Sequence, residues 1–560
     1  MKINASKNRI VLIFIAFSVI FLGLTGRIAA LSGSADLLEA ANRQRRYSLK
    51  AGNARGIIYD RNFNRLTDTQ EVYRAVIFPE SSAETINDTI RKITALSTLS
   101  ATDVQALYNS RKPFFADVPD PFTHIAKINE IPGGFIFKSF TRYSDNQAAA
   151  HIIGHLNPEE NEGVSGIEKA CDEFLSKRAN NNSISFLQDG AGYFIKGRGA
   201  DISDTRMDTG GVVLTIDKGI QAITERIGNE RIKKGAIVIS DPYNGDILAS
   251  ASFPGINPNN LADSVNDTQN SPMINRAFYS YNVGSTFKIA VTAAALESGI
   301  STGFSYKCKG KIEIQDQTFR CHERSGHGVL DMNSALTKSC NTYYIYLASK
   351  MKVSVLRQKA YDLGYGKPIG FYNGYRSSGG YLPSEADLNI PGELANFSFG
   401  QGKFLANPVQ INAALSAILN DGKYLAPRLI RGFTSDGSRI ESESENAPIP
   451  AVNPSSALKV KEFLIEAMSE RADNEDGPKT VTVGGKTGTA QTGRKNSAGK
   501  EEYSAWFCGF FPAHKPLYVV TVLIEDGESG NRFAFPVFSL LADEITNYNI
   551  YANLPADGSR

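Results

Sequence analysis

Cysteine is scarce in this sequence, and neither sign of charge predominates. The 560 residues include 5 cysteines, which excludes a disulfide-rich scaffold and leaves room for a bridge or two at most. Lys and Arg total 60 against 58 Asp and Glu, a net charge of +2, and this balance gives no electrostatic reason to expect nucleic acid as a partner. No internal repeat or long low-complexity tract is evident. A chain of this length has enough residues for two or more domains.

Charge is also missing from residues 10–26, which are predominantly apolar. Such a run is near the lower limit for crossing a bilayer. Basic residues, among them Lys7 and Arg9, precede it, and basic residues favour the cytoplasmic side. We therefore predict a cytoplasmic tail at 1–9, a transmembrane anchor at 10–30 and an extracytoplasmic remainder. A cleaved signal peptide is the alternative, because small residues follow the run.

Ser285 and Lys288 place a hydroxyl and an amine three residues apart where an apolar, helix-forming run begins. Residues at this spacing share one face of a helix. A serine hydroxyl is a poor nucleophile unless a neighbour accepts its proton, and a desolvated lysine with a lowered pKa can do so. The spacing alone carries little weight, because it recurs at Ser456 and Lys459.

Two further short motifs belong with this pair. Ser339 and Asn341 lie between two predicted helices and can reach one site only if the segment is a turn or extended. Lys486, Thr487 and Thr489 follow a predicted strand, and such groups on a strand edge can hold a substrate carboxylate. Each motif is common by itself, but the three in this order indicate one site.

Strand-like segments occur on both sides of a long helical middle. An Asn244-Gly245 turn joins two β-rich runs between 235 and 250 and is a strong hairpin signal. The other predicted elements are strands at 212–217, 480–483, 505–511 and 517–524, a helical segment at 84–110 and a closing helix at 535–545. This order predicts an α+β fold, in which one antiparallel sheet is flanked by helices.

With these motifs in place, the chain resembles the penicillin-recognising serine acyltransferases, whose active-site motifs are Ser-x-x-Lys, Ser-x-Asn and Lys-Thr-Gly. It looks most like a class B penicillin-binding protein, because we find no acidic glycosyltransferase motif of the class A kind. The supporting motifs are Arg55-Gly-Ile-Ile-Tyr-Asp-Arg-Asn62, His151-Ile-Ile-Gly-His155, Gly163-Val-Ser-Gly-Ile-Glu168, Gly400-Gln-Gly402, Pro408-Val-Gln410 and Trp506-Phe-Cys-Gly-Phe-Phe-Pro512. The resemblance implies a penicillin-binding transpeptidase fold, with an amino-terminal pedestal at 31–210 and a transpeptidase domain at 211–560.

The resemblance also implies a reaction and a role for each motif. Ser285 would attack the penultimate D-Ala carbonyl of a peptidoglycan stem peptide, with Lys288 as base, and a second stem would then take the acyl group. Ser339 would relay a proton and Asn341 would bind the substrate amide. Lys486, Thr487, Gly488 and Thr489 would hold the terminal carboxylate, and the backbone N–H groups of Ser285 and Thr489 would form the oxyanion hole.

The implied partners are stem peptides, β-lactams that acylate Ser285, the membrane and a polymerising membrane glycosyltransferase, with no nucleic acid. The implied location is the cell membrane, with a single span and an extracytoplasmic catalytic domain. A D,D-carboxypeptidase and a serine β-lactamase use the same acyl-enzyme and are alternatives, as is a membrane-anchored β-lactam sensor or silent scaffold. Two positions depart from the family pattern, Val283 in place of proline and Asn407 in place of threonine.

No cofactor is required by this chemistry, but Cys308, Cys321 and His327 lie between the first two motifs. Two thiolates and an imidazole suit a tetrahedral zinc site, with a fourth ligand that the sequence does not identify. A Cys308–Cys321 disulfide and free thiols are the alternatives. Cys340 and Cys508 are predicted to be buried, inert thiols.

Overall fold

A computed structural model of the chain describes residues 2–33, 46–50, 55–79, 86–110, 112–118, 127, 131, 134–157, 161–178, 183–187, 201–202, 209–443, 446–472, 476–495 and 499–552. These residues belong to two compact units. The small unit comprises Met1–Ala54, Gln70–Arg142 and Asn180–Met207, and the large unit comprises Arg55–Thr69, Tyr143–Ala179 and Asp208–Arg560. The division into a pedestal at 31–210 and a catalytic domain at 211–560 stays a prediction. The two compact units divide the chain at other residues, and segments of the large unit lie between segments of the small one in the sequence.

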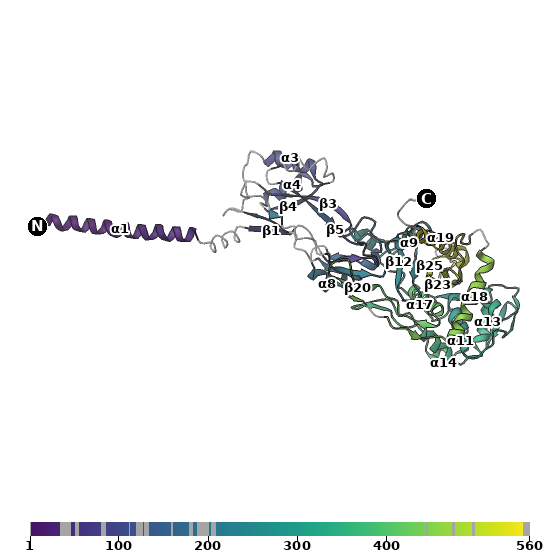
Figure 1. Ribbon diagram of the computed structural model, residues 1–560. Helices are drawn as coiled ribbons and strands as arrows, with labels where there is room; N and C mark the ends of the chain where they lie inside the picture. Colours follow the sequence, from purple (N-terminus) through teal and green to yellow (C-terminus); the bar gives the residue numbers. More distant parts are fainter. Residues whose placement is uncertain are drawn as a thin grey trace, which may run out of the picture. The chain divides into compact units, whose positions relative to one another are not determined.

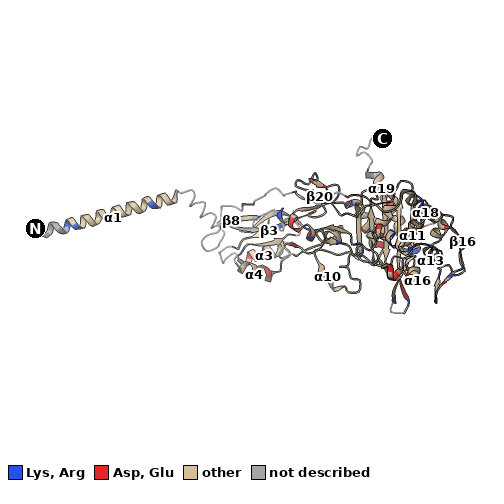
Figure 2. Cartoon of the chain, turned by 90° about the horizontal axis from the view of Figure 1, so that it is seen from below, with Lys and Arg blue, Asp and Glu red and all other residues tan. Residues whose placement is uncertain are grey.

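The charge-free run predicted to anchor the chain lies in one long helix, α1 (Lys2–Ser32). Its portion Lys7–Ser32 is long and apolar enough to cross a membrane, by length and composition. The apolar side chains along it are exposed, for example Phe14 at 73%. In Figure 2 the ribbon of α1 carries the blue of Lys and Arg near its start and again towards its end, and is tan between them.

The small unit is built around a three-stranded antiparallel sheet with the order β4-β3-β5. Apolar residues of two helices, including Ile93 and Val104, pack in one core with residues of this sheet. Ser100 caps the second helix by accepting a hydrogen bond from the backbone N–H of Asp103, so the helical segment predicted at 84–110 is two helices. The elements of this unit besides α1 are β1 (Arg46–Lys50), β3 (Gln70–Ile77), α3 (Ile86–Leu96), α4 (Ala101–Asn109), β4 (Phe114–Asp117), β5 (Gly134–Thr141), β8 (Ser183–Leu187) and β9 (Asp201–Ile202).

The large unit contains the predicted antiparallel sheet, which has five strands in the order β12-β11-β25-β24-β23. The Asn244-Gly245 turn joins the first two strands as predicted, and Gly245 has a φ of +77°. The strands are β11 (Gly235–Ser240), β12 (Ile247–Phe253), β23 (Gly484–Lys495), β24 (Glu501–Phe511) and β25 (Tyr518–Ile524). Helices cover both faces (Figure 1), so the α+β fold predicted from the sequence is confirmed.

Alternate residues of β24 pack into the two layers on either side of this sheet. Trp506 and Cys508 join the core that contains α11 (Lys288–Glu297) and α17 (Pro408–Leu419). Phe507 joins the core of α9 (Lys218–Arg231) and α19 (Phe535–Ala552). A strand covered on both faces has this continuous apolar composition. The register of β24 is set by its pairing with β25 on one side and with β23 on the other.

The prediction of a strand at 480–483 is wrong, because β23 begins only at Gly484. The backbone N–H groups of Lys479 and Thr480 donate to the carboxylate of Asp543 in α19 at 2.7–2.9 Å. Those donors are therefore used by a helix side chain and not by a strand ladder.

Asn407, which departs from the family pattern, caps α17. Its side chain accepts a hydrogen bond from the N–H of Gln410 at 2.9 Å and donates one to the carbonyl oxygen of Ser378 at 2.7 Å. The Gln410 side chain in turn accepts from the Asn407 N–H, which completes a capping box. Asn407 thus provides a hydrogen-bond partner both for an N–H group in the first turn of α17 and for the carbonyl oxygen of Ser378.

A buried ion network ties together the segments of the large unit that precede residue 180. The guanidinium of Arg55 lies 3.3 Å from the carboxylate of Glu168 and 2.7 Å from that of Asp172. The side chains of Arg55 and Glu168 are both fully buried. β2 (Ile57–Tyr59), which follows Arg55, pairs in parallel with β10 (Gly211–Leu214).

The other elements of the large unit surround the sheet or connect it. They are α6 (Ala150–Ile153), β6 (Leu156–Asn157), β7 (Glu162–Gly163), α7 (Gly166–Ala170), α8 (Asp172–Lys177), α9 (Lys218–Arg231), α10 (Leu261–Asn266), η1 (Gly284–Phe287), β13 (Tyr306–Cys308), β14 (Lys311–Ile314), β15 (Gln317–Arg320), β16 (Gly328–Leu330), α12 (Met332–Thr337), α13 (Asn341–Ala348), α14 (Val353–Asp362), β17 (Gly370–Tyr372), β18 (Tyr375–Arg376), α15 (Glu385–Leu388), α16 (Pro391–Phe397), β19 (Lys423–Tyr424), β20 (Ile430–Thr434), β21 (Ser442–Glu443), β22 (Ile449–Pro450), α18 (Pro454–Ala472), η2 (Gly530–Ala534) and α19 (Phe535–Ala552).

Candidate active site

Ser285 lies in a tight 3₁₀ turn, η1, and the α-helix predicted to open at this serine begins at Lys288. Gly284 starts the turn with a φ of +57°, a conformation that favours glycine. Its N–H donates to the carbonyl oxygen of Gly400 at 2.9 Å. A Cβ at Gly284 would lie 2.6 Å from the carbonyl oxygen of Thr489, so the turn fits closely against β23.

The side chain of Lys288 is fully buried and points at Ser285. Its Nζ lies 3.0 Å from Ser285 Oγ, 2.8 Å from the carbonyl oxygen of Ser339 and 2.7 Å from Asn341 Oδ1. Burial lowers the pKa of Lys288 to about 7, because the charged amine is removed from water. A neutral amine has two hydrogens and one lone pair. The two oxygen acceptors match the hydrogens, which leaves the lone pair for Ser285.

The second motif is held in a turn, as the spacing of its side chains required. Ser339 has a φ of +52°, and it lies between the end of α12 and the start of α13 at Asn341. The N–H of Ser339 donates to the carbonyl oxygen of Leu336 at 3.1 Å. This left-handed residue turns the chain so that the Ser339 Oγ lies 3.3 Å from Lys288 Nζ.

The third motif lies at the start of the edge strand β23. Lys486 is 2% exposed, and its Nζ donates to the carbonyl oxygen of Thr487 at 3.2 Å. A Cβ at Gly488 would lie 3.0 Å from the methyl of Thr286 in η1, so glycine allows strand and turn to touch. The Thr489 Oγ1 accepts a hydrogen bond from the N–H of Gly530 at 3.2 Å. The structure thus brings all three predicted motifs together.

Other groups position the site in ways that the sequence did not indicate, although Trp506 belongs to a quoted motif. The indole N–H of Trp506 donates to the carbonyl oxygen of Asn282, three residues before the serine, at 3.1 Å. The Tyr281 hydroxyl donates to Glu525 at 2.7 Å, and the Arg276 guanidinium donates to the same carboxylate oxygen at 2.8 Å. These partners come from distant elements, and no local pattern in the sequence marks the pairing.

A compact thiol and imidazole cluster adjoins the second motif. Cys308, Cys321, His327 and Cys340 each offer one ligand atom, and these atoms all lie within 4.8 Å of one another. Cys321 Sγ is 3.9 Å from Cys340 Sγ and 3.6 Å from His327 Nδ1. All five cysteines are free and buried. The structure therefore adds Cys340, predicted to be inert, to the three predicted ligands.

Two segments of the sequence match families of known domains. Residues 235–542 match the Penicillin binding protein transpeptidase domain, and residues 50–191 match the Penicillin-binding Protein dimerisation domain. Peptidoglycan D,D-transpeptidase MrdA of Acinetobacter baumannii is 28% identical over 547 residues, covering 87% of this chain and 80% of that protein. Stage V sporulation protein D of Bacillus subtilis is 25% identical over 510 residues, covering 88% and 77%.

The fold also occurs among solved structures. A complex between penicillin-binding protein PBP2 and MreC from Helicobacter pylori contains a chain that superposes with a TM-score of 0.65 at 22% identity. The match covers 90% of this chain and 99% of that one. Similarity at this level of identity shows a shared fold.

Proposed function

The chain belongs to the class B penicillin-binding proteins and is a peptidoglycan D,D-transpeptidase, and we propose that Ser285 is its nucleophile, the residue that the donor substrate acylates. One observation carries this proposal. Lys288 Nζ is fully buried and lies 3.0 Å from Ser285 Oγ. Its hydrogens are directed to the oxygens of Ser339 and Asn341 at 2.8 and 2.7 Å.

In the acylation step, neutral Lys288 takes the Ser285 proton while Oγ bonds to the penultimate D-Ala carbonyl carbon. The carbonyl π electrons move to oxygen, where the backbone N–H groups of Ser285 and Thr489 stabilise the charge. The bond to terminal D-alanine then breaks. Its nitrogen receives a proton relayed by Ser339, whose Oγ is 3.3 Å from Lys288 Nζ.

The remaining motif residues bind the donor stem. Lys486, Thr487 and Thr489 hold its terminal carboxylate beside Gly488, and Asn341 binds its amide through the Nδ2 group. In the second step the amino group of another stem attacks the acyl-enzyme and Ser285 regains its proton. Transfer to water in place of the amine would make the enzyme a carboxypeptidase or a β-lactamase.

The test of this assignment is intact-protein mass spectrometry of the full-length chain after incubation with a penicillin, followed over time. A stable single adduct on Ser285, absent from the Ser285→Ala protein, is expected. A crosslinking assay with stem peptides then separates a transpeptidase from a sensor or silent scaffold. Labelling that persists in Ser285→Ala would refute the assignment, and an adduct that vanishes quickly would favour the β-lactamase alternative.

We further propose that the cluster of Cys308, Cys321, His327 and Cys340 binds a structural zinc ion. In a tetrahedral site the sulfur atoms are about 3.8 Å apart, and sulfur and nitrogen are about 3.5 Å apart. The Cys321–Cys340 and Cys321–His327 separations of 3.9 and 3.6 Å fit these values. Bound zinc would fix Cys340, which stands between Ser339 and Asn341 in the second motif.

Metal analysis of the purified full-length protein tests this proposal. One zinc per chain is expected, falling in Cys340→Ser and Cys308→Ser but not in the matched buried-thiol control Cys508→Ser. Cys508 lies on β24, where its Sγ is 3.2 Å from Thr521 Oγ1. Protein that takes up no zinc, or that contains a Cys308–Cys321 disulfide by mass spectrometry, would refute the proposal.

For the whole chain we propose a single span through α1, with the large unit and the part of the small unit that follows α1 on the extracytoplasmic side. The basic residues Lys7 and Arg9 before the apolar stretch support this orientation. The Helicobacter pylori relative was solved in complex with MreC, which supports a protein partner for this chain too, alongside a membrane glycosyltransferase. Protease digestion of intact spheroplasts should degrade the large unit, and its protection would contradict the orientation.

A further inference from the structure

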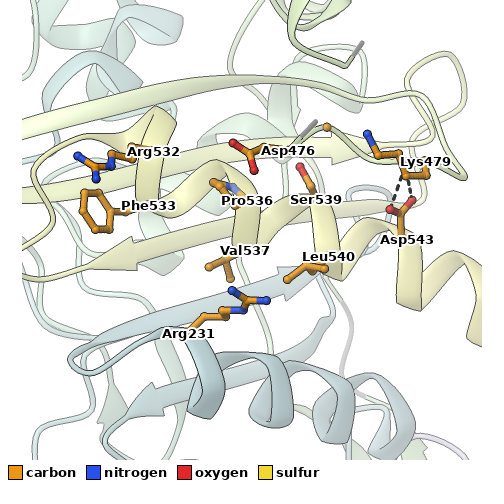
Figure 3. Close-up of a pocket in the computed structure, with 11 residues that line it drawn as sticks. Arg231, Asp476, Lys479, Arg532, Phe533, Pro536, Val537, Ser539, Leu540 and Asp543 are labelled. Atoms are coloured by element: carbon orange, nitrogen blue, oxygen red, sulfur yellow. Dashed lines mark hydrogen bonds between the residues drawn. The ribbon is translucent and has the colours of Figure 1, made fainter. Parts of the chain in front are cut away.

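A groove lies along the first turns of α19, at the end of the large unit (Figure 3). Its volume is about 390 Å³. Val537 and Leu540 form an apolar part of its lining, while Asp476 and Lys479 belong to the segment before β23. The three active-site motifs contribute no lining residue, so this is a separate space.

Two arginines from different elements line the groove. Arg231 ends α9, and Arg532 lies on the π-helical turn η2. Neither guanidinium forms an ion pair with a carboxylate of the described residues, although the charge of Arg532 acts on Glu528 and its guanidinium lies 5.6 Å from the centre of the Phe533 ring. The acids beside the two arginines in sequence pair with other cations. Glu230 pairs with Arg226 at 3.7 Å, and Glu528 pairs with Lys500 at 2.5 Å. Guanidinium groups suit carboxylate or phosphate oxygens, which they bind in pairs of hydrogen bonds.

The two acids of the groove differ in what they can do. The Asp543 carboxylate already accepts hydrogen bonds from the N–H groups of Lys479 and Thr480 and from the Thr480 hydroxyl. Asp476 is exposed and has no such partner among the described residues. An acid at this position repels a purely anionic ligand and attracts an ammonium group. The lining therefore favours a ligand with carboxylates, an ammonium group and an apolar portion.

The groove is connected to β23, the strand that carries the third motif, through η2, the turn that carries Arg532. Gly530 of the same turn donates its N–H to Thr489 Oγ1 at 3.2 Å. A Cβ at Gly530 would overlap the carbonyl oxygens of Gly488 and Trp506, so the turn lies directly on β23 and β24. π-Helical turns occur often at functional sites. A ligand that holds Arg532 would thus act on a turn that touches the carboxylate-binding motif.

We propose that this groove is a second binding site for peptidoglycan stem peptides, in which Arg231 and Arg532 hold carboxylates and Asp476 holds an ammonium group. The identity of the ligand rests on the proposed function, because stem peptides carry all these groups. A stem peptide bound at this site would keep the enzyme on the peptidoglycan between reactions. It would also restrain η2 and, through Gly530, the hydroxyl of Thr489.

The test uses full-length protein in detergent whose Ser285 has first been acylated with penicillin, so that the reaction site is closed. The probe is a stem tripeptide without D-alanine, which cannot be an acyl donor. Calorimetric titration should show saturable binding of one tripeptide per chain. The single tryptophan of the chain is Trp506, and its emission should change on binding because its backbone adjoins Gly530.

Four variants identify the binding groups. Arg231→Gln and Arg532→Gln should each raise the tripeptide Kd about tenfold, as expected for loss of one charge-assisted contact, and the double variant should abolish the change in emission. Asp476→Asn should weaken tripeptide binding but strengthen binding of inorganic pyrophosphate. The matched control Arg439→Gln removes an arginine that is 78% exposed elsewhere in the unit and should leave the Kd unchanged.

Each contrary result has a defined meaning. Absence of saturable binding to the acylated protein, or a double variant that binds as wild type does, would overturn the second site. Pyrophosphate that displaces the tripeptide and binds more tightly would assign the groove to phosphate ligands and overturn the stem-peptide assignment. If no acyl adduct forms, the proposed function has failed independently, and the same titration on Ser285→Ala still tests the groove.

Discussion

The Nζ of Lys288 donates a hydrogen bond to Oδ1 of Asn341 at 2.7 Å, across 53 residues of sequence. This contact joins the first motif to the second and fixes the amine in the direction of Ser285. The same amine is fully buried, and its chemistry therefore depends on pH in a way that can be measured.

Acylation by penicillin should accelerate as the pH rises through about 7, the pKa to which burial lowers Lys288. Below this pH the amine is protonated and cannot accept the Ser285 proton, whereas above it the amine is neutral and the rate should level off. The rate constant of adduct formation, measured by rapid mixing from pH 5.5 to 9, checks this. A rate that is flat or falls between pH 6 and 8 would exclude Lys288 as the base.

Lys288→Ala should slow acylation by about 10⁴–10⁶, the range seen when one member of a catalytic group that acts as a unit is removed. Lys459→Ala is the matched control, since Ser456 and Lys459 have the same spacing but Lys459 pairs with Glu462 on the surface. Far-ultraviolet circular dichroism should show both variants folded. A loss of less than tenfold in Lys288→Ala would show that another group takes the proton.

Gly400→Ala should slow acylation about a hundredfold, the cost of misplacing a reacting group by about 1 Å. Gly400 has a φ of +76°. A Cβ there would overlap the carbonyl oxygen of Gly284 in η1, the turn that carries Ser285. Gly374→Ala is the control, because Gly374 has a φ of +81° but no atom within 4 Å of the added Cβ. Equal acylation rates in the two variants would mean that backbone strain, not displacement of Ser285, explains the effect.

Arg55→Leu should lower the free energy of unfolding by about 3–5 kcal/mol, because it leaves the carboxylate of Glu168 buried without its cation. Urea denaturation of the large unit measures this loss. The double variant Arg55→Leu/Glu168→Leu should recover part of the stability, since the unpaired charge is then gone. Arg439→Leu, at an exposed site, should change it by no more than about 0.5 kcal/mol. A similar loss in both arginine variants would contradict the buried-pair explanation.

Local sequence patterns predicted much of the fold and the motifs of the site. The Asn244-Gly245 hairpin and the closing helix were predictable because turn chemistry and periodicity act within a few residues. The motifs were recognised through their order along the chain. The turn at Ser339 was required by the spacing of its side chains, although its left-handed backbone was not predicted.

Features set by packing were beyond such patterns. The strand predicted at 480–483 failed because Asp543, far along the chain, takes the backbone donors of Lys479 and Thr480. The closeness of Cys340 to the other members of the cluster was not predicted, because those three residues come from outside its own segment. The pKa of Lys288 depends on complete burial, which no spacing within Ser-x-x-Lys specifies.

The path of the chain through the two units also determines the order in which they can form during synthesis. The β4-β3-β5 sheet of the small unit is complete once β5 has been made, at Thr141, whereas its second sheet, β1-β8-β9, needs the chain as far as Ile202. β2, by contrast, must wait for its parallel partner β10 at Gly211–Leu214, so the large unit closes last around segments made early. A recombinant fragment that starts at residue 211 would lack β2 and expose an edge of β10 that is prone to pairing with other chains.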